Sequence, residues 1–124
     1  MQVTFLGTAA AEGIPALWCA CEHCAAARRE RGRSLRRRSA LLIDGRLLID
    51  FGPDIVDAVA QLGLDLSPVR TLLITHDHED HLHLPSLAIR REGFCATPLR
   101  KYWSAISLPP SWLRLSIGGC GCGR

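Results

Sequence analysis

The chain has 124 residues, of which 48% are hydrophobic and 22% are charged, and its formal net charge is +3. This length allows one domain with a real core, and this composition excludes wholesale disorder. No apolar run approaches the ~20 residues of a membrane-spanning helix, which excludes a membrane-spanning protein. The N-terminus lacks the basic and apolar regions of a secretory signal, so we expect one domain in the cytoplasm.

The first half of the chain predicts a strand, a helix and a hairpin. Residues 2–6 have the composition of a short strand and are followed by a loop that begins at a glycine. Residues 22–31 are mostly good helix formers and predict a short helix. Residues 39–50 contain two apolar runs on either side of Asp44 and Gly45, a pair that adopts the positive φ angles of a type I′ turn. We therefore expect a β-hairpin there.

The second half continues with a helix, a strand and another helix. Pro53 suits the first turn of a helix and Gly63 suits its end, and the apolar residues between them recur at helical spacing: Ile55, Val56, Val59 and Leu62. Residues 69–75 form a continuous apolar run that is typical of a buried strand. Pro85 opens a further short helix. This order predicts an α/β (α+β layered) protein with helices on a mostly β core.

The end of the chain differs in composition. From residue 93 onward there is no Asp or Glu, and the last seven residues are Gly, Cys and Arg only. We find no period there that would define a continuing fold. The interpretation is a domain over residues 1–99 and an atypical tail over residues 100–124, either disordered or read out of frame.

Positive charge is concentrated in residues 28–38. Seven arginines and one glutamate give this segment +6, which leaves −3 for the rest of the chain. Two interpretations stay open: a solvated connection, or a basic rim that attracts a phosphate-bearing substrate. No aromatic residue interleaves with the arginines, which argues against a surface that stacks nucleic-acid bases.

A run of metal-ligand side chains directly follows the strand predicted at 69–75. Six consecutive residues carry three imidazoles and three carboxylates: His76, Asp77, His78, Glu79, Asp80 and His81. An extended backbone aims the first two histidines at one face, and these ligand types suit zinc, iron or manganese. The alternative is a surface loop that is rich in histidine by chance. It is disfavoured because four of the five histidines lie within residues 76–83.

Three cysteines, Cys19, Cys21 and Cys24, lie within six residues. Without an export signal, a disulfide framework is disfavoured. Three thiolates at this spacing predict a zinc site that requires a fourth ligand from elsewhere. A free-thiol role is the alternative.

Together these motifs resemble a known family. His-x-His-x-Asp-His after an apolar strand, with LLIDFGPD upstream, resembles the signature of the metallo-β-lactamase superfamily. The Gly-Thr strand exit followed by Cys-x-Cys-x-x-Cys is similar to the PhnP-type cyclic phosphodiesterases. The resemblance covers residues 2 to about 99. It implies the N-terminal half of an αββα sandwich.

The resemblance implies a role for each residue of the histidine motif. His76 and His78 would bind one metal ion, and Asp80 and His81 would bind a second. Asp50 would be the carboxylate that orients these ligands. Asp80 and Asp50 are thus the expected catalytic carboxylates. Zinc is the expected metal, with manganese or iron as alternatives at this site.

The resemblance also implies a second metal site and leaves one residue open. Cys19, Cys21 and Cys24 would hold a separate structural zinc. His83 follows the motif closely, and its role stays open. The implied function is a metal-dependent hydrolase of small phosphodiesters, such as cyclic phosphates, that acts through a metal-bound hydroxide. An RNA phosphodiesterase is an alternative, although a nucleic-acid partner is not favoured.

The chain departs from the family in its ligand count. It has no His after His83 and no Asp after Asp80, whereas family members supply a third histidine, a bridging aspartate and a last histidine after the motif. We therefore expect one of three situations: a truncated or frameshifted fragment, half of an assembly such as a homo-oligomer, or an inactive zinc-binding domain.

Overall fold

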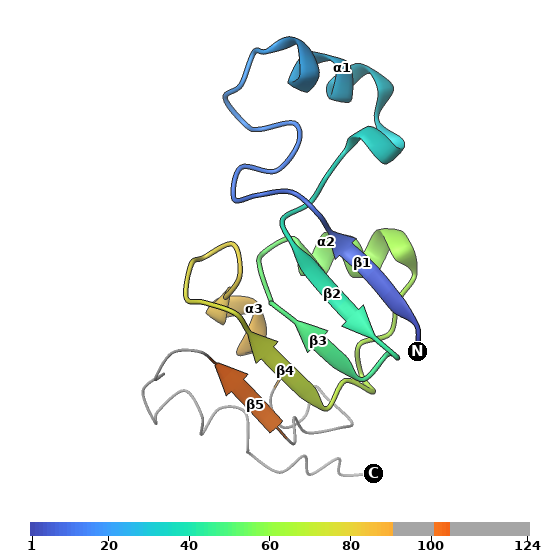
Figure 1. The fold of residues 1–124 in the computed structure, drawn as a ribbon, viewed down its shortest axis with the longest axis vertical. Helices are drawn as coiled ribbons and strands as arrows, with labels where there is room; N and C mark the ends of the chain where they lie inside the picture. Colours follow the sequence, from blue (N-terminus) through green and yellow to red (C-terminus); the bar gives the residue numbers. More distant parts are fainter. Residues whose placement is uncertain (91–100, 105–124) are drawn as a thin grey trace.

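The computed structural model describes residues 1–90 and 101–104. They form one five-stranded sheet in the order β1 to β5 (Figure 1), with strands β1 (Val3–Gly7), β2 (Ala40–Ile43), β3 (Leu47–Ile49), β4 (Thr71–Ile74) and β5 (Lys101–Ser104). The first three strands pair antiparallel, and β3, β4 and β5 pair parallel. The mixed α/β architecture that the sequence predicts is confirmed.

Helices lie on the sheet and in a projecting segment. They are α1 (Glu22–Glu30), the 3-10 helix η1 (Gly32–Ser34), α2 (Ile55–Leu62) and α3 (Leu84–Leu87). Within the described ranges, none has the length and apolar character that crossing a bilayer requires. α2 packs its buried Ile55 and Ala58 into the main core beside the sheet.

The core lies on one face of the sheet. β4 alternates, with Leu72 and Ile74 at 1% and 0% exposure and their neighbours half-buried. On β1 the buried side chain is Leu6, whereas Val3 and Phe5 are 39% and 64% exposed. Because side chains alternate along a strand, the apolar residues of β1 that point away from α2 meet no helix.

The predicted hairpin is confirmed, and its turn has the expected backbone. Asp44 and Gly45 have φ angles of 49° and 64°, and the Arg46 N–H donates a 3.0 Å hydrogen bond to the Ile43 carbonyl. Positive φ at both central positions lets the turn follow the twist of the two strands.

The helix at 55–62 differs from the expectation at two points. Pro53 lies in the turn before α2 and not in its first turn, because Asp54 takes the N-cap position. Two of the apolar residues at helical spacing are exposed, Val56 at 62% and Leu62 at 46%, because the face turned to the sheet is that of Ile55 and Ala58. Its end is as predicted, since Gly63 has the left-handed φ of 61°.

Strand β5 lies in the segment where the sequence indicates no element. It pairs in parallel with β4 over its whole length. The rest of the tail at 100–124 lies outside the described residues, so the domain boundary at residue 99 stays a prediction.

Residues 8–38 form a projecting segment, here called the N-terminal arm, that leaves the sheet after β1 and returns at β2 (Figure 1). α2 holds its base, because Arg37 bonds Asp57 at 2.5 Å and Gln61 at 2.5 Å. The Arg37 guanidinium also lowers the pKa of Asp57. The arm is thus fixed to the sheet domain at its return point.

We expect Leu72→Ala to lower the free energy of unfolding by about 2–5 kcal/mol, because it leaves a cavity in a closely packed core. Val56→Ala, at an exposed position of α2, should change it by less than about 0.5 kcal/mol. Urea unfolding followed by circular dichroism measures both. Equal effects would contradict the assignment of the core to the α2 side of the sheet.

Candidate metal centre

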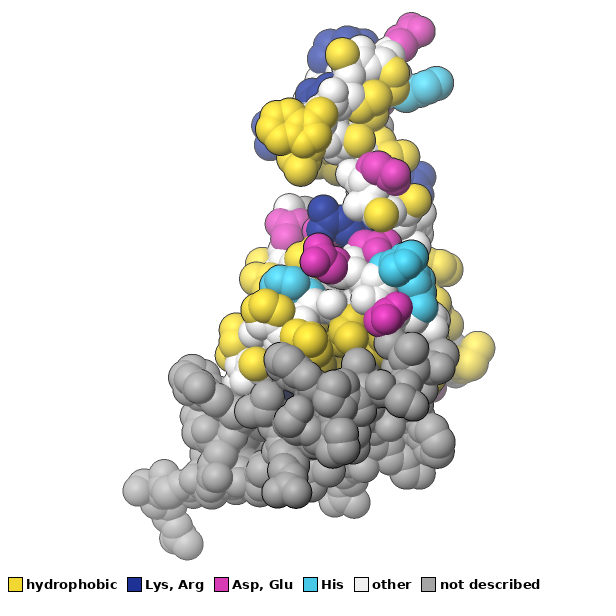
Figure 2. All heavy atoms as spheres, turned by 90° about the vertical axis from the view of Figure 1, so that its left-hand side faces the viewer, with side chains coloured by type: hydrophobic (Ala, Val, Ile, Leu, Met, Phe, Trp, Pro, Cys, Tyr) yellow, Lys and Arg dark blue, Asp and Glu magenta, His cyan; other side chains and the backbone are white. Residues whose placement is uncertain are grey.

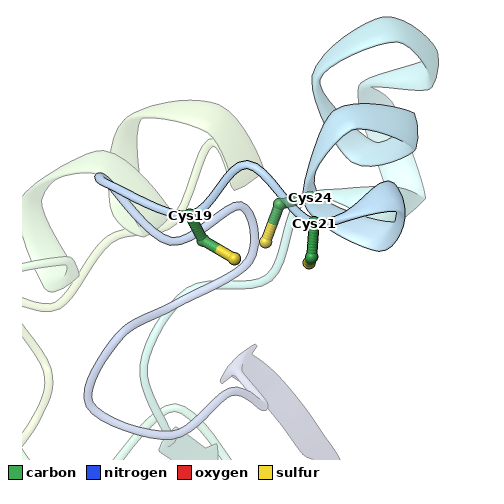
Figure 3. Close-up of side chains that lie close together, drawn as sticks. All are labelled: Cys19, Cys21 and Cys24. Carbon is green, nitrogen blue, oxygen red and sulfur yellow. The ribbon is translucent and has the colours of Figure 1, made fainter.

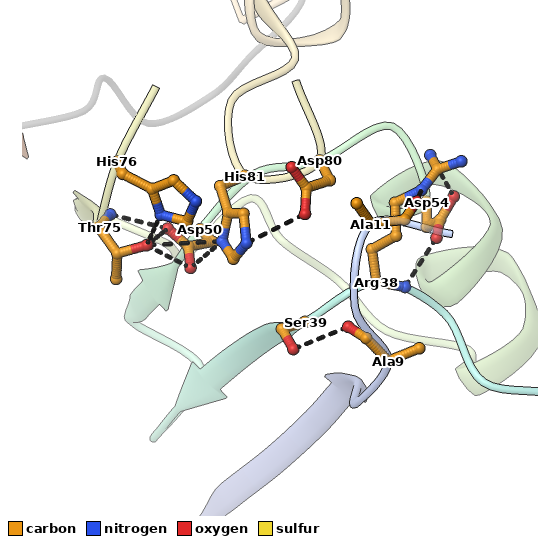
Figure 4. Close-up of polar contacts among 10 residues, drawn as sticks. All are labelled: Ala9, Ala11, Arg38, Ser39, Asp50, Asp54, Thr75, His76, Asp80 and His81. Carbon is orange, nitrogen blue, oxygen red and sulfur yellow. Dashed lines mark hydrogen bonds and ion pairs between the residues drawn. The ribbon is translucent and has the colours of Figure 1, made fainter. Parts of the chain in front are cut away.

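The candidate site is built around Asp50, which directly follows β3. Asp50 is 4% exposed and is the buried charged residue of the described chain. Its φ of 61° lies in the left-handed region, which costs free energy in any residue except glycine. Its backbone N–H donates a 2.8 Å hydrogen bond to the Leu73 carbonyl of β4. The carboxylate thereby points toward Thr75 and His81 (Figure 4).

The Asp50 carboxylate accepts hydrogen bonds from both ends of the loop after β4. Its Oδ1 accepts from the Thr75 N–H at 2.8 Å and from the Thr75 hydroxyl at 2.9 Å. Its Oδ2 lies 2.7 Å from His81 Nδ1. A buried carboxylate without such donors would strongly destabilise the fold. Asp50 therefore ties the start of the histidine loop to its end.

These contacts indicate which ring nitrogen of each histidine carries a proton. Because a carboxylate only accepts, we assign the His81 Nδ1 proton to its bond with Asp50, which leaves Nε2 with a lone pair. His76 Nδ1 lies 3.0 Å from the Thr75 hydroxyl, whose own proton goes to Asp50. His76 then donates through Nδ1 as well. Both histidines keep Nε2 as a metal ligand.

The donor set fits a metal ion. Ligand atoms of His76, Asp80 and His81 all lie within 4.8 Å of one another, and His81 Nε2 lies 3.1 Å from Asp80 Oδ2 (Figure 4). Two imidazoles and a carboxylate suit zinc, manganese or iron.

His78 lies beside this group and not within it. Its ring meets that of His76 edge to face, with centroids 4.7 Å apart, and its side chain is exposed. In the structure His76 groups with Asp80 and His81. The family resemblance instead assigns His76 to one metal ion and Asp80 with His81 to a second. The division of ligands between two ions therefore stays a prediction.

Two residues to which the sequence assigned no role help to build the site. Thr75 connects His76 to Asp50, as described above, and Gly52 allows two backbone segments to meet. A Cβ on Gly52 would lie 2.1 Å from the Asp80 carbonyl oxygen. Their positions in the sequence could have identified them, since Thr75 directly precedes the first histidine of the motif and Gly52 follows Asp50 by two residues.

His83, whose role the sequence left open, lines a hollow beside the group. Its Nδ1 lies 2.9 Å from the Ser86 hydroxyl, which orients the ring. The hollow has a volume of about 350 Å³, and Asp80 and Arg38 also line it. Arg38 is held there by Asp54, with its Nη1 3.2 Å from Oδ1. This hollow therefore places a cation and an imidazole next to the candidate metal ligands.

The three cysteines gather at the start of α1 (Figure 3). Cys19 ends the preceding loop, Cys21 is the N-cap residue and Cys24 lies in the first turn. Their sulfur atoms lie within 4.8 Å of one another, and all three thiols are free. Among residues 1–90 and 101–104, no further His, Cys, Asp or Glu joins this group. A fourth zinc ligand is not found in this part of the chain.

Hydrogen bonds within the cysteine group shift two pKa values in opposite directions. The backbone N–H of Cys24, followed by the side chains of Cys19 and Cys24, lowers the pKa of Cys21 to about 7. A backbone hydrogen bond from Cys21 lowers the pKa of Cys19, but the side chains of Cys21 and Cys24 outweigh it and raise that pKa. Cys21 is therefore about half thiolate at neutral pH, the form that binds metals.

Comparison with known proteins supports the family resemblance. Residues 34–84 match the family model described as "Metallo-beta-lactamase superfamily". The chain is 36% identical over 105 residues to "Coenzyme PQQ synthesis protein B" of Methylobacterium radiotolerans, and the match covers 75% of this chain and 34% of that protein. The chain thus spans about a third of the length of this curated relative.

Solved structures confirm the fold. A diphosphatase from the PhnP family superposes with a TM-score of 0.57 and 28% identity, over 71% of this chain and 34% of that one. Zn²⁺-bound PqqB from Methylobacterium extorquens superposes with a TM-score of 0.63 and 28% identity, over 74% and 35%. Human tRNase Z, short form, shares the fold with a TM-score of 0.56 at 23% identity, over 92% and 39%.

We expect Asp50→Ala to lower the free energy of unfolding by about 2–4 kcal/mol, since it leaves the Thr75 and His81 donors without their acceptor. Asp57→Ala removes a more exposed carboxylate and should cost less than about 1 kcal/mol. Urea unfolding measures both. If the two variants unfold at the same urea concentration, Asp50 does not hold the loop.

Proposed function

We propose that this chain carries a metal-dependent hydrolytic site for phosphodiesters. His76, Asp80 and His81 are its metal ligands, with His78 as a neighbouring ligand. The proposal rests above all on the convergence of these ligand atoms next to a buried aspartate that holds the His81 ring through Nδ1. The match of residues 34–84 to the metallo-beta-lactamase superfamily supports it.

The residues of the chain prepare the site in three ways. When bound, metal ions supply Lewis-acid activation of water and neutralise charge on phosphoryl oxygens. Asp50 accepts a hydrogen bond from His81 Nδ1 and thereby orients the His81 ring as a ligand. Asp80 faces both the ligand group and the hollow, so its carboxylate is placed to accept a proton from an attacking water.

A phosphodiester anion fits the hollow next to the ligands. The volume of about 350 Å³ accepts a phosphoryl group with small substituents, and Arg38 brings positive charge beside Asp80. The Ala11 carbonyl and Asp54 hold this guanidinium in place, at 2.8 Å and 3.2 Å (Figure 4). The PhnP-family diphosphatase and the tRNase Z among the structural neighbours support a phosphorus-centred reaction.

The cysteine group is proposed as a structural zinc site. Three sulfur atoms within 4.8 Å of one another suit tetrahedral zinc, with one ligand still to be identified. The lowered pKa of Cys21 favours binding at neutral pH. This zinc would join the loop before α1 to the helix and would thereby order the N-terminal arm.

The likeness to PqqB favours a second candidate, a step in coenzyme PQQ synthesis. The match of 36% identity over 105 residues includes most of this chain. The same metal ligands would then serve a different substrate. The two candidates differ in the expected product and not in the site.

We expect His76→Ala to remove metal from the histidine site while the cysteine-bound zinc remains, and Cys21→Ser to do the reverse. Native mass spectrometry of the full chain reports metal content together with the expected homo-oligomer. Hydrolysis of bis(4-nitrophenyl) phosphate should fall by more than about 100-fold in His76→Ala, because loss of an outer partner alone costs 10–100-fold. Unchanged total metal would contradict the ligand assignment, and no hydrolysis by the metal-loaded wild type would overturn the proposal.

The second candidate is tested by expressing the chain in Methylobacterium extorquens that lacks PqqB. If phosphodiester hydrolysis is the function, coenzyme PQQ measured by mass spectrometry stays absent. Restored coenzyme PQQ that is lost again in His76→Ala would replace the first candidate with the second.

A further inference from the structure

The N-terminal arm carries dense and largely unpaired positive charge. Five of its arginines are exposed: Arg28, Arg29, Arg31, Arg33 and Arg36. In the described chain none of these five forms an ion pair with a carboxylate, whereas Arg37 and Arg38 pair with residues of and before α2. A cluster of exposed guanidinium groups without carboxylate partners attracts polyanions.

The structure adds an aromatic side chain to this charge. Trp18 and Leu17 are 96% and 77% exposed, on the loop that precedes α1. Arg28 of α1 donates a 2.8 Å hydrogen bond to the carbonyl of Ala16, two residues before Trp18, so this loop lies against the arginine-bearing helix. Figure 2 shows hydrophobic side chains of the arm beside Lys and Arg side chains. The arginine segment itself contains no aromatic residue, and the fold brings one from the preceding loop to the same part of the arm.

A groove continues this surface between the arm and α2. Its volume is about 570 Å³. Leu17, Ile14 and Leu35 form an apolar wall, and Arg33 and Arg36 add positive charge to the lining. The carboxylates of Glu12, Asp54 and Asp57 also line it, and the last two pair with Arg38 and Arg37. Apolar walls with arginines nearby suit a ligand that has both flat apolar rings and negative charge.

We propose that the arm and this groove bind a single-stranded nucleic acid. Bases stack on Trp18 and lie against the apolar wall of the groove. Phosphates contact the exposed arginines. A stacking platform beside a positively charged track is how proteins bind single strands without sequence preference.

The exposed side chains of α1 favour a nucleic acid over a membrane surface. A helix that lies in a bilayer interface needs an apolar outer face. Of the apolar residues of α1, Cys24 and Ala27 are buried and the two alanines between them are half-buried, whereas Glu22, His23 and Glu30 are exposed. A small inorganic anion, on the other hand, would leave the exposure of Trp18 without a role.

The groove and the hollow beside Asp80 share one lining residue, Arg38. Delivery of a bound strand to that hollow would rest on the proposed function, whereas binding by the arm does not.

The test is binding of a fluorescein-labelled single-stranded oligouridine of ~10 nucleotides to the full chain, measured by fluorescence anisotropy. We expect Trp18→Ala to weaken binding by about 5- to 100-fold through loss of stacking. The triple variant Arg29→Ser, Arg31→Ser, Arg33→Ser should reduce the slope of log affinity against log salt by about 2, since each phosphate contact on a single strand contributes roughly 0.7.

Matched controls separate the arm from general effects. Phe5→Ala changes an exposed aromatic residue on β1, and Arg70→Ser changes an exposed arginine just before β4. Both should leave affinity unchanged. The proposal is overturned if the wild type does not bind, or if the controls weaken binding as much as the arm variants. It is also overturned if Trp18→Ala affects only binding to phosphatidylserine vesicles. Because no step of this assay requires hydrolysis, failure of the binding proposal is distinct from failure of the proposed function.

Discussion

The burial of the Asp50 carboxylate is the constraint on which the rest of the site depends. A charge that is 4% exposed persists only where donors surround it. Here the donors are Thr75 at the start of the histidine loop and His81 at its end. The bond that satisfies the carboxylate at Oδ2 also orients the His81 ring, and the Thr75 hydroxyl that bonds Asp50 also contacts His76. Burial of one carboxylate therefore fixes both the ends of the loop and the arrangement of the candidate ligands.

The backbone around this carboxylate is arranged to permit it. The left-handed φ of Asp50 turns the chain sharply at the end of β3. The next residue, Phe51, donates its N–H to the His81 carbonyl and accepts from the His83 N–H, at 2.7 Å each. Gly52 then passes so close to Asp80 that no side chain fits. A local strain at one residue is offset by pairing on both sides of it.

The candidate metal centre and the surface proposed to bind nucleic acid lie on different parts of the molecule. The metal-ligand group sits at the end of parallel strands, on a rigid sheet whose core lies on one side. The N-terminal arm projects from that sheet and is tied to α2 by Arg37. Its three cysteines join the loop that carries Trp18 to the first turn of α1 in one group of sulfur atoms. Of the seven clustered arginines, two hold the arm in place and five face solvent. The interpretation as a connection therefore suits the first two, and the interpretation as a basic rim suits the other five.

Much of the local structure could be predicted from the sequence, because its determinants are short-range. Asp44-Gly45 specifies its own turn, Gly63 ends its helix, and the spacing of the cysteines and histidines groups their ligands. The exposure of Val56, the pairing of β5 with β4, the use of Thr75 and Gly52, and the bond of Arg28 to the loop that carries Trp18 could not be predicted. Each of these features depends on which distant segment of the chain packs against it. The sequence by itself determined the ligand types and the fold class, since both follow from composition and periodicity. Only the tertiary structure decided which ligands converge, because convergence requires a buried carboxylate from one strand to meet a loop 25 residues later in the chain.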